Sequence, residues 1–148
     1  MSASPDVVLA YWSEHRQQLR QSETQRAVLT NYLLVITAGL SGFVVQQKFA
    51  AVTLPVAILI IGIGLYGAVS SAKYHERAQY HLVQARALPK TLKDMGALAD
   101  DRHIEEFRKA HYRAYPRLSG IHLHWLWTGL HLAISIYGLA FLLIIILR

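Results

Sequence analysis

Three long runs without a charged side chain constrain this sequence more than any other feature. They cover residues 27–45, 49–72 and 125–147. A helix needs roughly 20 apolar residues to cross the hydrocarbon layer, and in lipid the backbone must form its hydrogen bonds internally. Because 53% of the 148 residues are hydrophobic and most of them fall in these runs, the chain is predicted to be an all-α integral membrane protein.

The alternative is that a run forms the core helix of a soluble protein. FLLIIIL, residues 141–147, has no polar face to present to water, which argues against that alternative. The first residues lack an apolar stretch behind a basic one, so the first run is expected to be a retained anchor and not a signal peptide. The chain has no cysteine, which excludes disulfides and a thiolate nucleophile.

Lysine and arginine are distributed unevenly between the segments that connect the runs. Residues 73–117 carry ten of them and residues 1–26 carry three, whereas the link between the first two runs carries only Lys48. Cytoplasmic segments of membrane proteins have an excess of these residues. The N-terminus and residues 73–117 are therefore predicted to be cytoplasmic, and the C-terminus is predicted to face outward.

Breaker residues predict a helical hairpin with long cytoplasmic extensions, followed by a third membrane helix. The first helix is expected to run unbroken from about residue 6 to residue 45. The second is expected to have Pro55 in its first turn and to end at Leu88, because Pro89 follows. The predicted segments are a cytoplasmic helix (1–26), a first transmembrane helix (27–45), an outer turn (46–52), a second transmembrane helix (53–72), a cytoplasmic helical region (73–117) and a third transmembrane helix (118–148).

Two packing faces are predicted that lie mainly outside the membrane runs. One is a seam on the first helix at alternating spacings of four and three residues, formed by Val8, Trp12, His15, Leu19, Ser22, Arg26 and Leu29. The other lies on a short helix that Asp100 or Asp101 can cap and that ends at Pro116. Its side bearing Ile104, Phe107, His111 and Tyr115 is expected to pack against the paired helices.

The histidines were the first candidates for chemistry. HERAQYH, residues 75–81, begins like a zinc-protease motif, but its second histidine falls six residues after the first instead of four. We therefore predict no metal site there, and the chain is expected to bind no cofactor. No nucleophile–base set or phosphate-binding glycine loop is present either, so the chain is predicted not to be an enzyme.

His131 is the one titratable side chain well inside a membrane run, roughly 9 Å along the helix from Trp125. Ionisable groups at such positions usually face protein or a water-filled path. Its alternative role is that of a neutral histidine hydrogen-bonded to a hydroxyl such as Ser41 or Ser70. The candidates to line a polar path are Asn31, Thr37, Ser41 and His131.

Small residues recur at four-residue spacing in the membrane runs. Such pairs let helix backbones approach closely, which is how helices associate in lipid. Three helices offer more small faces than they can bury among themselves, so a homo-oligomer is predicted. The candidate contact residues are Ala38, Gly42, Gly64, Ala68, Ala72, Gly129 and Ala133.

The net charge of +6 is explained mainly by the orientation of the chain and by attraction to anionic lipid headgroups. A nucleic-acid surface gathers basic residues on one face with aromatic residues between them. Here Asp94, Glu105 and Glu106 are interleaved with the basic residues. We therefore predict membrane lipids and a cytosolic protein as partners, and no nucleic acid.

The hairpin resembles the SLATT-type effectors of bacterial anti-phage systems. The resemblance covers residues 6–90 and is carried by QSETQRAVLTNYLLVITAGLSG leading into the membrane and GAVSSAKYHERAQYHLVQARAL leading out of it. It implies an inner-membrane protein that oligomerises and forms a pore, or disrupts the membrane, once a partner sensor is triggered. The family pattern has two membrane helices, and residues 125–147 add a third.

Three functions follow as hypotheses. The first is a non-enzymatic effector that self-assembles and depolarises the membrane, as the resemblance implies. The second is a structural or accessory membrane subunit that docks a cytosolic partner through its helical stalk. The third is a haem or quinone subunit, which an absorption spectrum of the purified protein would identify.

Overall fold

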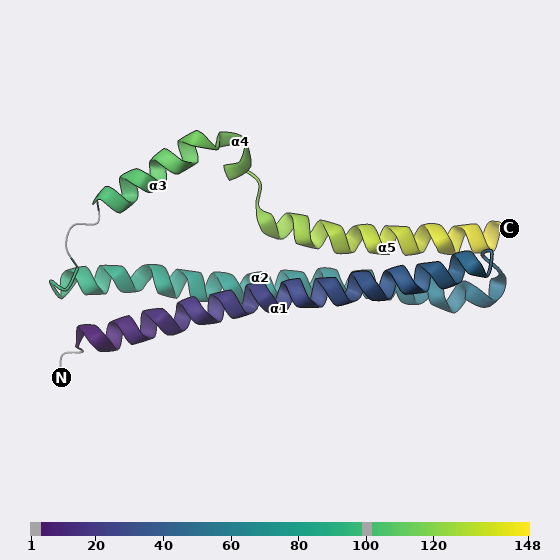
Figure 1. Ribbon diagram of the computed structural model, residues 1–148, viewed down its shortest axis with the longest axis horizontal. Coiled ribbons are helices and arrows are strands. Elements are labelled where there is room, and N and C mark those ends of the chain that lie inside the picture. Colours follow the sequence, from purple (N-terminus) through teal and green to yellow (C-terminus); the bar gives the residue numbers. More distant parts are fainter. Residues whose placement is uncertain (1–3, 99–101) are drawn as a thin grey trace. The chain divides into compact units, whose positions relative to one another are not determined.

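The computed structural model describes residues 4–98 and 102–148, and this part of the chain is helical without any strand. The all-α fold class is therefore confirmed (Figure 1). The elements are α1 (Pro5–Gln46), a 3₁₀ turn (Ala51–Thr53), α2 (Leu54–Asp94), α3 (Arg102–Ala114), α4 (Pro116–Ser119) and α5 (Leu123–Leu147). Asp100 and Asp101, the predicted caps of α3, lie outside the described residues.

Packing divides the chain into two units. The first unit combines residues 1–23 with residues 76–122, and the second combines residues 24–75 with residues 123–148. The helices α1, α2 and α5 are each long and apolar enough to cross a membrane. These are the features of a multi-pass membrane protein.

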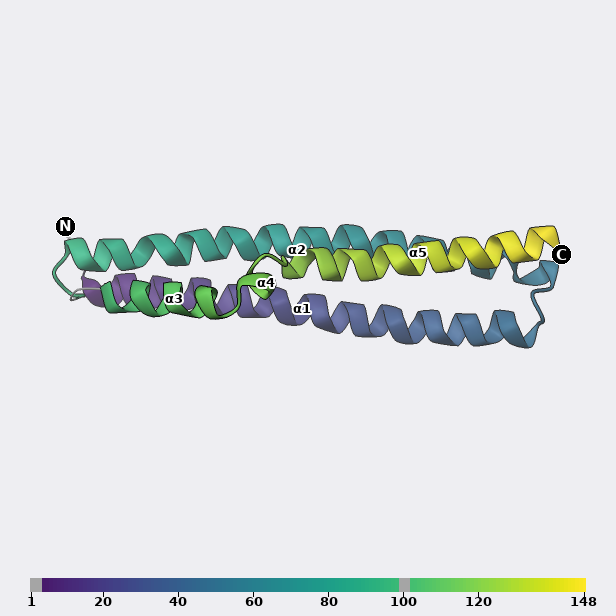
Figure 2. The ribbon, with the colours of Figure 1, turned by 90° about the horizontal axis from the view of Figure 1, so that it is seen from above.

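The helix α1 runs without interruption from Pro5 to Gln46, as the absence of breakers before residue 27 predicted (Figure 2). The turn that follows contains two residues in the left-handed region, Lys48 at φ 52° and Phe49 at φ 57°. This conformation is unfavourable for residues with a Cβ. The ring of Phe49 packs edge-on against Phe141 with 5.3 Å between centroids, so contact with α5 holds the turn in place.

The expectation that Pro89 ends the second helix is wrong, because α2 continues through Pro89 to Asp94. A proline inside a helix removes one hydrogen bond, and the other bonds of the helix continue on both sides of it. Gly96 ends α2 instead. Its φ of 71° lets the N–H of Ala97 bond the carbonyl of Leu92 at 2.9 Å, while its own N–H bonds the carbonyl of Lys93 at 2.9 Å. This arrangement is a Schellman cap.

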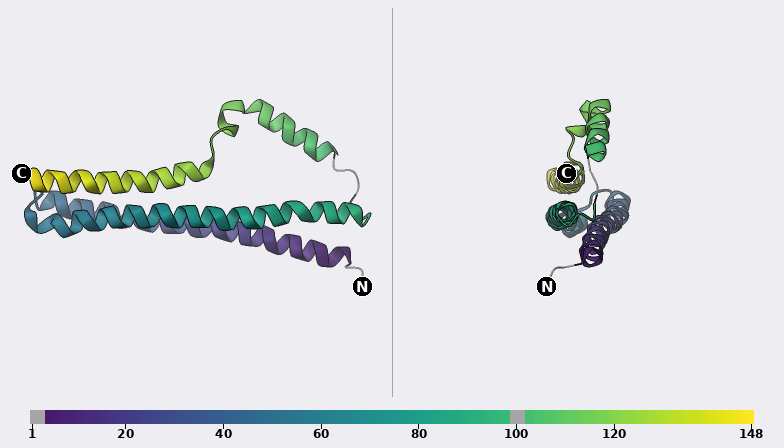
Figure 3. Two further views of the ribbon diagram at one scale, coloured as in Figure 1. Left: turned by 180° about the vertical axis from the view of Figure 1, so that it is seen from behind. Right: turned by 90° about the vertical axis from the view of Figure 1, so that its left-hand side faces the viewer.

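The second unit is built on packing of α1 and α2 against α5 (Figure 3). Its apolar core cluster draws residues from all three helices: Val44, Ala57, Ile60, Ile134, Phe141 and Ile145. The third transmembrane helix was expected to cover residues 118–148, whereas α5 begins at Leu123 and is preceded by the separate short helix α4.

In the first unit, the N-terminal part of α1 packs against the C-terminal part of α2. The contact buries Val8 and His15 on α1 and Ala78, Ala85 and Leu92 on α2. The predicted seam is therefore confirmed at Val8, His15 and Ser22, whereas Trp12 is exposed. The small alanines allow the two helices to approach closely.

The predicted packing of α3 against these helices is wrong for the side chains that the structure describes. Phe107 is 76% exposed, and His111 and Tyr115 are exposed as well. The side chain of Ile104 lies outside the described residues. Amphipathic spacing showed correctly that α3 has an apolar face, but spacing alone does not specify what covers that face.

The Gly96 cap generates a prediction for the end of α2. Gly96→Ala forces a Cβ into the left-handed region and should destabilise the last turns by about 1 kcal/mol. Pro89→Ala should instead protect them, because it restores a hydrogen bond within the helix. Hydrogen exchange of the amides from residue 85 to residue 95 measures both effects. Equal exchange in the two variants would contradict the assignment of Gly96 as the helix stop.

Candidate functional site

Four of the six buried residues of α1 in the second unit are polar, and most of its large exposed side chains are apolar. Arg26, Thr30, Thr37 and Ser41 are buried at spacings of four, seven and four residues. Large apolar side chains point outward on the same helix, including Val35, which is 71% exposed. A bundle in water has the reverse arrangement, whereas a bundle in lipid buries its polar groups. We call this buried set, together with Ser71, His131 and Ser135, the polar seam.

His131 lies at the centre of the polar seam and is fully buried. Its Nε2 lies 3.1 Å from Oγ1 of Thr30, and the same hydroxyl donates to the carbonyl of Arg26 at 2.9 Å. A hydroxyl has one hydrogen to donate. Thr30 must therefore accept from His131, which places a hydrogen on Nε2 and makes Nδ1 the acceptor of the neutral ring.

Two glycines on α2 allow α5 to approach this closely. A Cβ at Gly67 would lie 2.7 Å from Cγ and Cε1 of the His131 ring, and one at Gly64 would lie 2.7 Å from the backbone oxygen of His131. The Ser135 hydroxyl then donates to the carbonyl of Ile61 at 3.1 Å. Because Gly64 and Gly67 have no side chain, α2 leaves space for the polar side chains of α5.

Arg26 closes one end of the polar seam. Its side chain is buried, and its guanidinium carbon lies 5.2 Å from the centre of the Trp127 ring. An arginine over the face of a tryptophan is a favourable cation–π pair, and its strength increases away from water. The predicted packing seam of α1 included Arg26, but nothing in the sequence indicated its partner on α5.

Some buried polar atoms of the seam have no hydrogen-bond partner among the described residues, among them Oγ1 of Thr37, Oγ of Ser71 and Nδ1 of His131. A buried polar atom without a partner is destabilising, so such atoms commonly mark a place for water or for a second arrangement of the helices. The seam can therefore interact with water or an ion if the helices separate slightly.

The predicted polar residues divide into two groups. Thr37, Ser41 and His131 lie inside the bundle, whereas Asn31 is exposed on the outer face of α1. The suggested partners of His131, Ser41 and Ser70, are wrong because Thr30 occupies that role. Ser41 instead donates to the carbonyl of Thr37 at 2.6 Å, within its own helix.

The predicted small-residue contacts also fall into two groups, those buried within the chain and those exposed on its surface. Gly64 and Ala68 are buried within the chain, where Gly64 contacts α5, although they were expected between subunits. Open positions are found on all three membrane helices: Ala38 and Gly42 on α1, Ala72 on α2, and Gly129 and Ala133 on α5.

A pair of histidines joins α1 and α2 in the first unit. Nδ1 of His15 lies 3.0 Å from Nδ1 of His81, with the ring of Tyr11 against His15 and the ring of Tyr80 against both. Burial lowers the pKa of His81 from its ordinary value of 6.5, and His15 and Arg77 lower it further while Glu14 raises it. The contact needs one donor and one acceptor, so protonation of both rings breaks it.

Metal ligation finds no support in the part of the chain that the structure describes. No group of three or more His, Asp or Glu side chains lies close enough together there to hold an ion. In the second unit, His75 and His124 instead stack face to face at 3.9 Å. Comparison with protein-family models, curated protein sequences and solved structures finds no match for this chain.

The glycine contacts predict different effects for two valine substitutions. Gly67→Val should destabilise the second unit by roughly 1–3 kcal/mol, because the new side chain overlaps the His131 ring. Gly129→Val should leave that unit intact, since no atom of the described residues lies within 4 Å of the added Cβ. Thermal unfolding in detergent, followed by circular dichroism, measures the difference. An equal loss of thermal stability in both variants would contradict the packing of His131 on Gly67.

The histidine pair predicts that acid loosens the first unit. A histidine whose pKa is lowered by folding binds more protons when released, so stability falls as the pH drops through 6.5. Amides near His15 and His81 should exchange faster, after correction for intrinsic rates, at about pH 5.5 than at about pH 7.5. His81→Gln should remove this pH dependence, whereas His111→Gln, on exposed α3, should preserve it. Identical pH dependence in both variants would rule out His81 as its source.

Proposed function

We propose that this chain is a non-enzymatic membrane protein that assembles with copies of itself and opens a path for ions. The observation that supports the proposal best is the polar seam, a row of hydroxyl, imidazole and guanidinium groups inside a bundle of apolar helices. A bundle that served only as an anchor would be more stable with apolar residues at these positions. Their presence favours a function that uses polar groups at membrane depth.

The seam favours a closed state in a single chain. His131 is fully buried and bonded to Thr30, so no continuous polar surface faces outward there. Assembly through the open small residues, such as Gly42 and Gly129, would give neighbouring helices new contacts. Helices that rotate or separate on assembly would then turn the partnerless oxygens of Thr37 and Ser71 toward a shared water-filled path.

The location and trigger are part of the same proposal. The excess of basic residues in the sequence supports an orientation with the N-terminus and residues 73–117 in the cytoplasm of a bacterium and the C-terminus in the periplasm. The resemblance to SLATT-type effectors supports a role in anti-phage defence, with activation by a partner sensor. The unbroken helix α1 would connect a cytoplasmic signal directly to the polar seam.

Induced expression in bacteria with a voltage-sensitive dye tests the proposal. The native chain should depolarise the membrane when triggered or overproduced. The double variant Thr30→Val and His131→Leu should lower ion flux by about tenfold or more, because an apolar constriction expels water. Tyr66→Phe removes a hydroxyl from an exposed side chain of the same bundle and should have no effect.

The double variant needs a control for folding. His131→Gln keeps a polar group of similar length and should retain part of the flux, and circular dichroism of each purified variant checks its helix content. Full membrane potential in cells that produce the native chain, with and without a trigger, would refute the proposal. Equal flux through the native chain and a folded double variant would show that the path lies elsewhere.

A structural or accessory subunit is the second candidate function. Exposed apolar side chains on the two helices of the first unit favour it: Val7, Leu9, Tyr11, Tyr80 and Val83. Such a surface suits a cytosolic protein partner. Stoichiometric co-purification with that partner, together with no conductance in liposomes, would support this candidate against the first.

A further inference from the structure

The helix α3 and the short helix α4 carry an apolar surface that the first unit does not cover. Phe107 is 76% exposed, Leu118 is 66% exposed, and Tyr112 and Tyr115 are each more than half exposed. His111, Tyr112, Tyr115 and Leu118 line a shallow hollow on this surface. We call these residues, with Phe107, the α3 apolar face.

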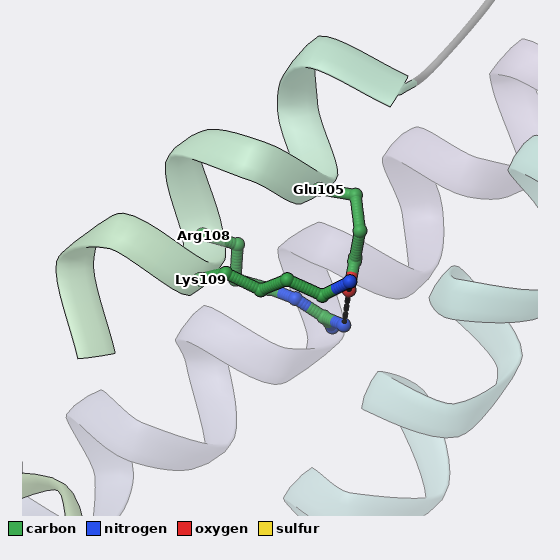
Figure 4. A network of polar contacts seen from close by, with 3 residues as sticks. All are labelled: Glu105, Arg108 and Lys109. Carbon is green, nitrogen blue, oxygen red and sulfur yellow. Dashed lines mark hydrogen bonds and ion pairs between the residues drawn. The ribbon is translucent and has the colours of Figure 1, made fainter. Parts of the chain in front are cut away.

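Charged side chains border the α3 apolar face. Glu105 accepts from Nη2 of Arg108 at 2.7 Å and lies 3.8 Å from Nζ of Lys109, and all three side chains are exposed (Figure 4). Residues 102–118 contain five Lys or Arg and two Glu, so this stretch has a net charge of +3 without its histidines. Helices with this division, an apolar face rich in aromatic residues and a basic remainder, are typical of membrane surfaces.

The chain itself limits how far Leu118, at one end of the α3 apolar face, can be from lipid. Leu118 is five residues before Leu123, the first residue of α5. An extended chain spans at most about 3.6 Å per residue. Leu118 therefore stays within roughly 18 Å of the start of a membrane-spanning helix, so this end of the α3 apolar face is held near the membrane surface.

We propose that α3 and α4 lie in the cytoplasmic surface of the membrane, with the α3 apolar face inserted between headgroups and the basic residues on anionic lipid. Phe107 and Leu118 would enter the acyl boundary, and the tyrosines would stay at headgroup level. Arg108, Arg113 and Arg117 would contact the lipid phosphates, each strengthening attachment about fivefold. The inference rests on α5 crossing the membrane and is independent of the ion path.

Site-directed spin labelling of the full chain in lipid nanodiscs tests the proposal. The chain has no cysteine, so Phe107→Cys and Lys109→Cys each introduce a single labelling site on opposite sides of α3. In nanodiscs with anionic phosphatidylglycerol, the label at 107 should be accessible to oxygen and protected from a water-soluble nickel complex. The label at 109 should show the opposite pattern.

A second set of samples separates lipid from other partners. Two changes should weaken the protection of the label at 107 from nickel: zwitterionic phosphatidylcholine nanodiscs, and the combined substitutions Arg108→Gln, Arg113→Gln and Arg117→Gln. The protection should fall by about 100-fold at most, because three charges each contribute about fivefold. Equal nickel access at 107 and 109 in anionic nanodiscs would overturn the proposal. Protection at 107 that depends on protein concentration or on an added cytosolic protein, and not on lipid charge, would overturn it in favour of a protein contact.

Discussion

The hydrogen bond between Thr30 and His131 is the interaction on which the membrane bundle most depends. It joins α1 to α5 across 101 positions of sequence and lies in a region where lipid offers no alternative partner. Lipid provides little hydrophobic driving force for helices to associate, so polar contacts and close packing must determine which helix faces meet. The polar seam supplies the first, and the glycines of α2 supply the second.

The same seam links stability to the proposed activity. Thr30 bonds both His131 and the carbonyl of Arg26, and Arg26 packs on Trp127, whereas Thr37, Ser71 and Nδ1 of His131 keep buried polar atoms without a partner among the described residues. A fully satisfied seam would favour one rigid arrangement. Because some polar atoms of the seam lack hydrogen bonds, a second arrangement of the helices becomes favourable when copies of the chain associate. An effector that stays inactive until it is triggered requires two such arrangements.

Much of the fold could be predicted because hydrophobic runs and helix breakers act locally. Spacing along the sequence predicts the long helix α1 and the burial of Val8 and His15. It also places the polar residue His131 deep inside the third apolar run. The errors concern contacts between distant segments. Pro89 was expected to end α2, whereas the Gly96 cap does so, and the partner of His131 came from a threonine that spacing alone could not select over Ser41. Gly67 and Trp127 complete the site, and only the arrangement of three helices brings them to it.

The order of the elements along the chain has a consequence for biosynthesis. Thr30 and Arg26 emerge from the ribosome before the histidine and tryptophan that contact them, because these belong to α5, which follows α1 to α4 along the chain. Until translation reaches that helix, α1 lacks the contacts that His131 and Trp127 provide, at a depth where lipid offers no polar partner. A polypeptide released before α5 is finished would therefore be an unstable hairpin and a substrate for membrane proteases.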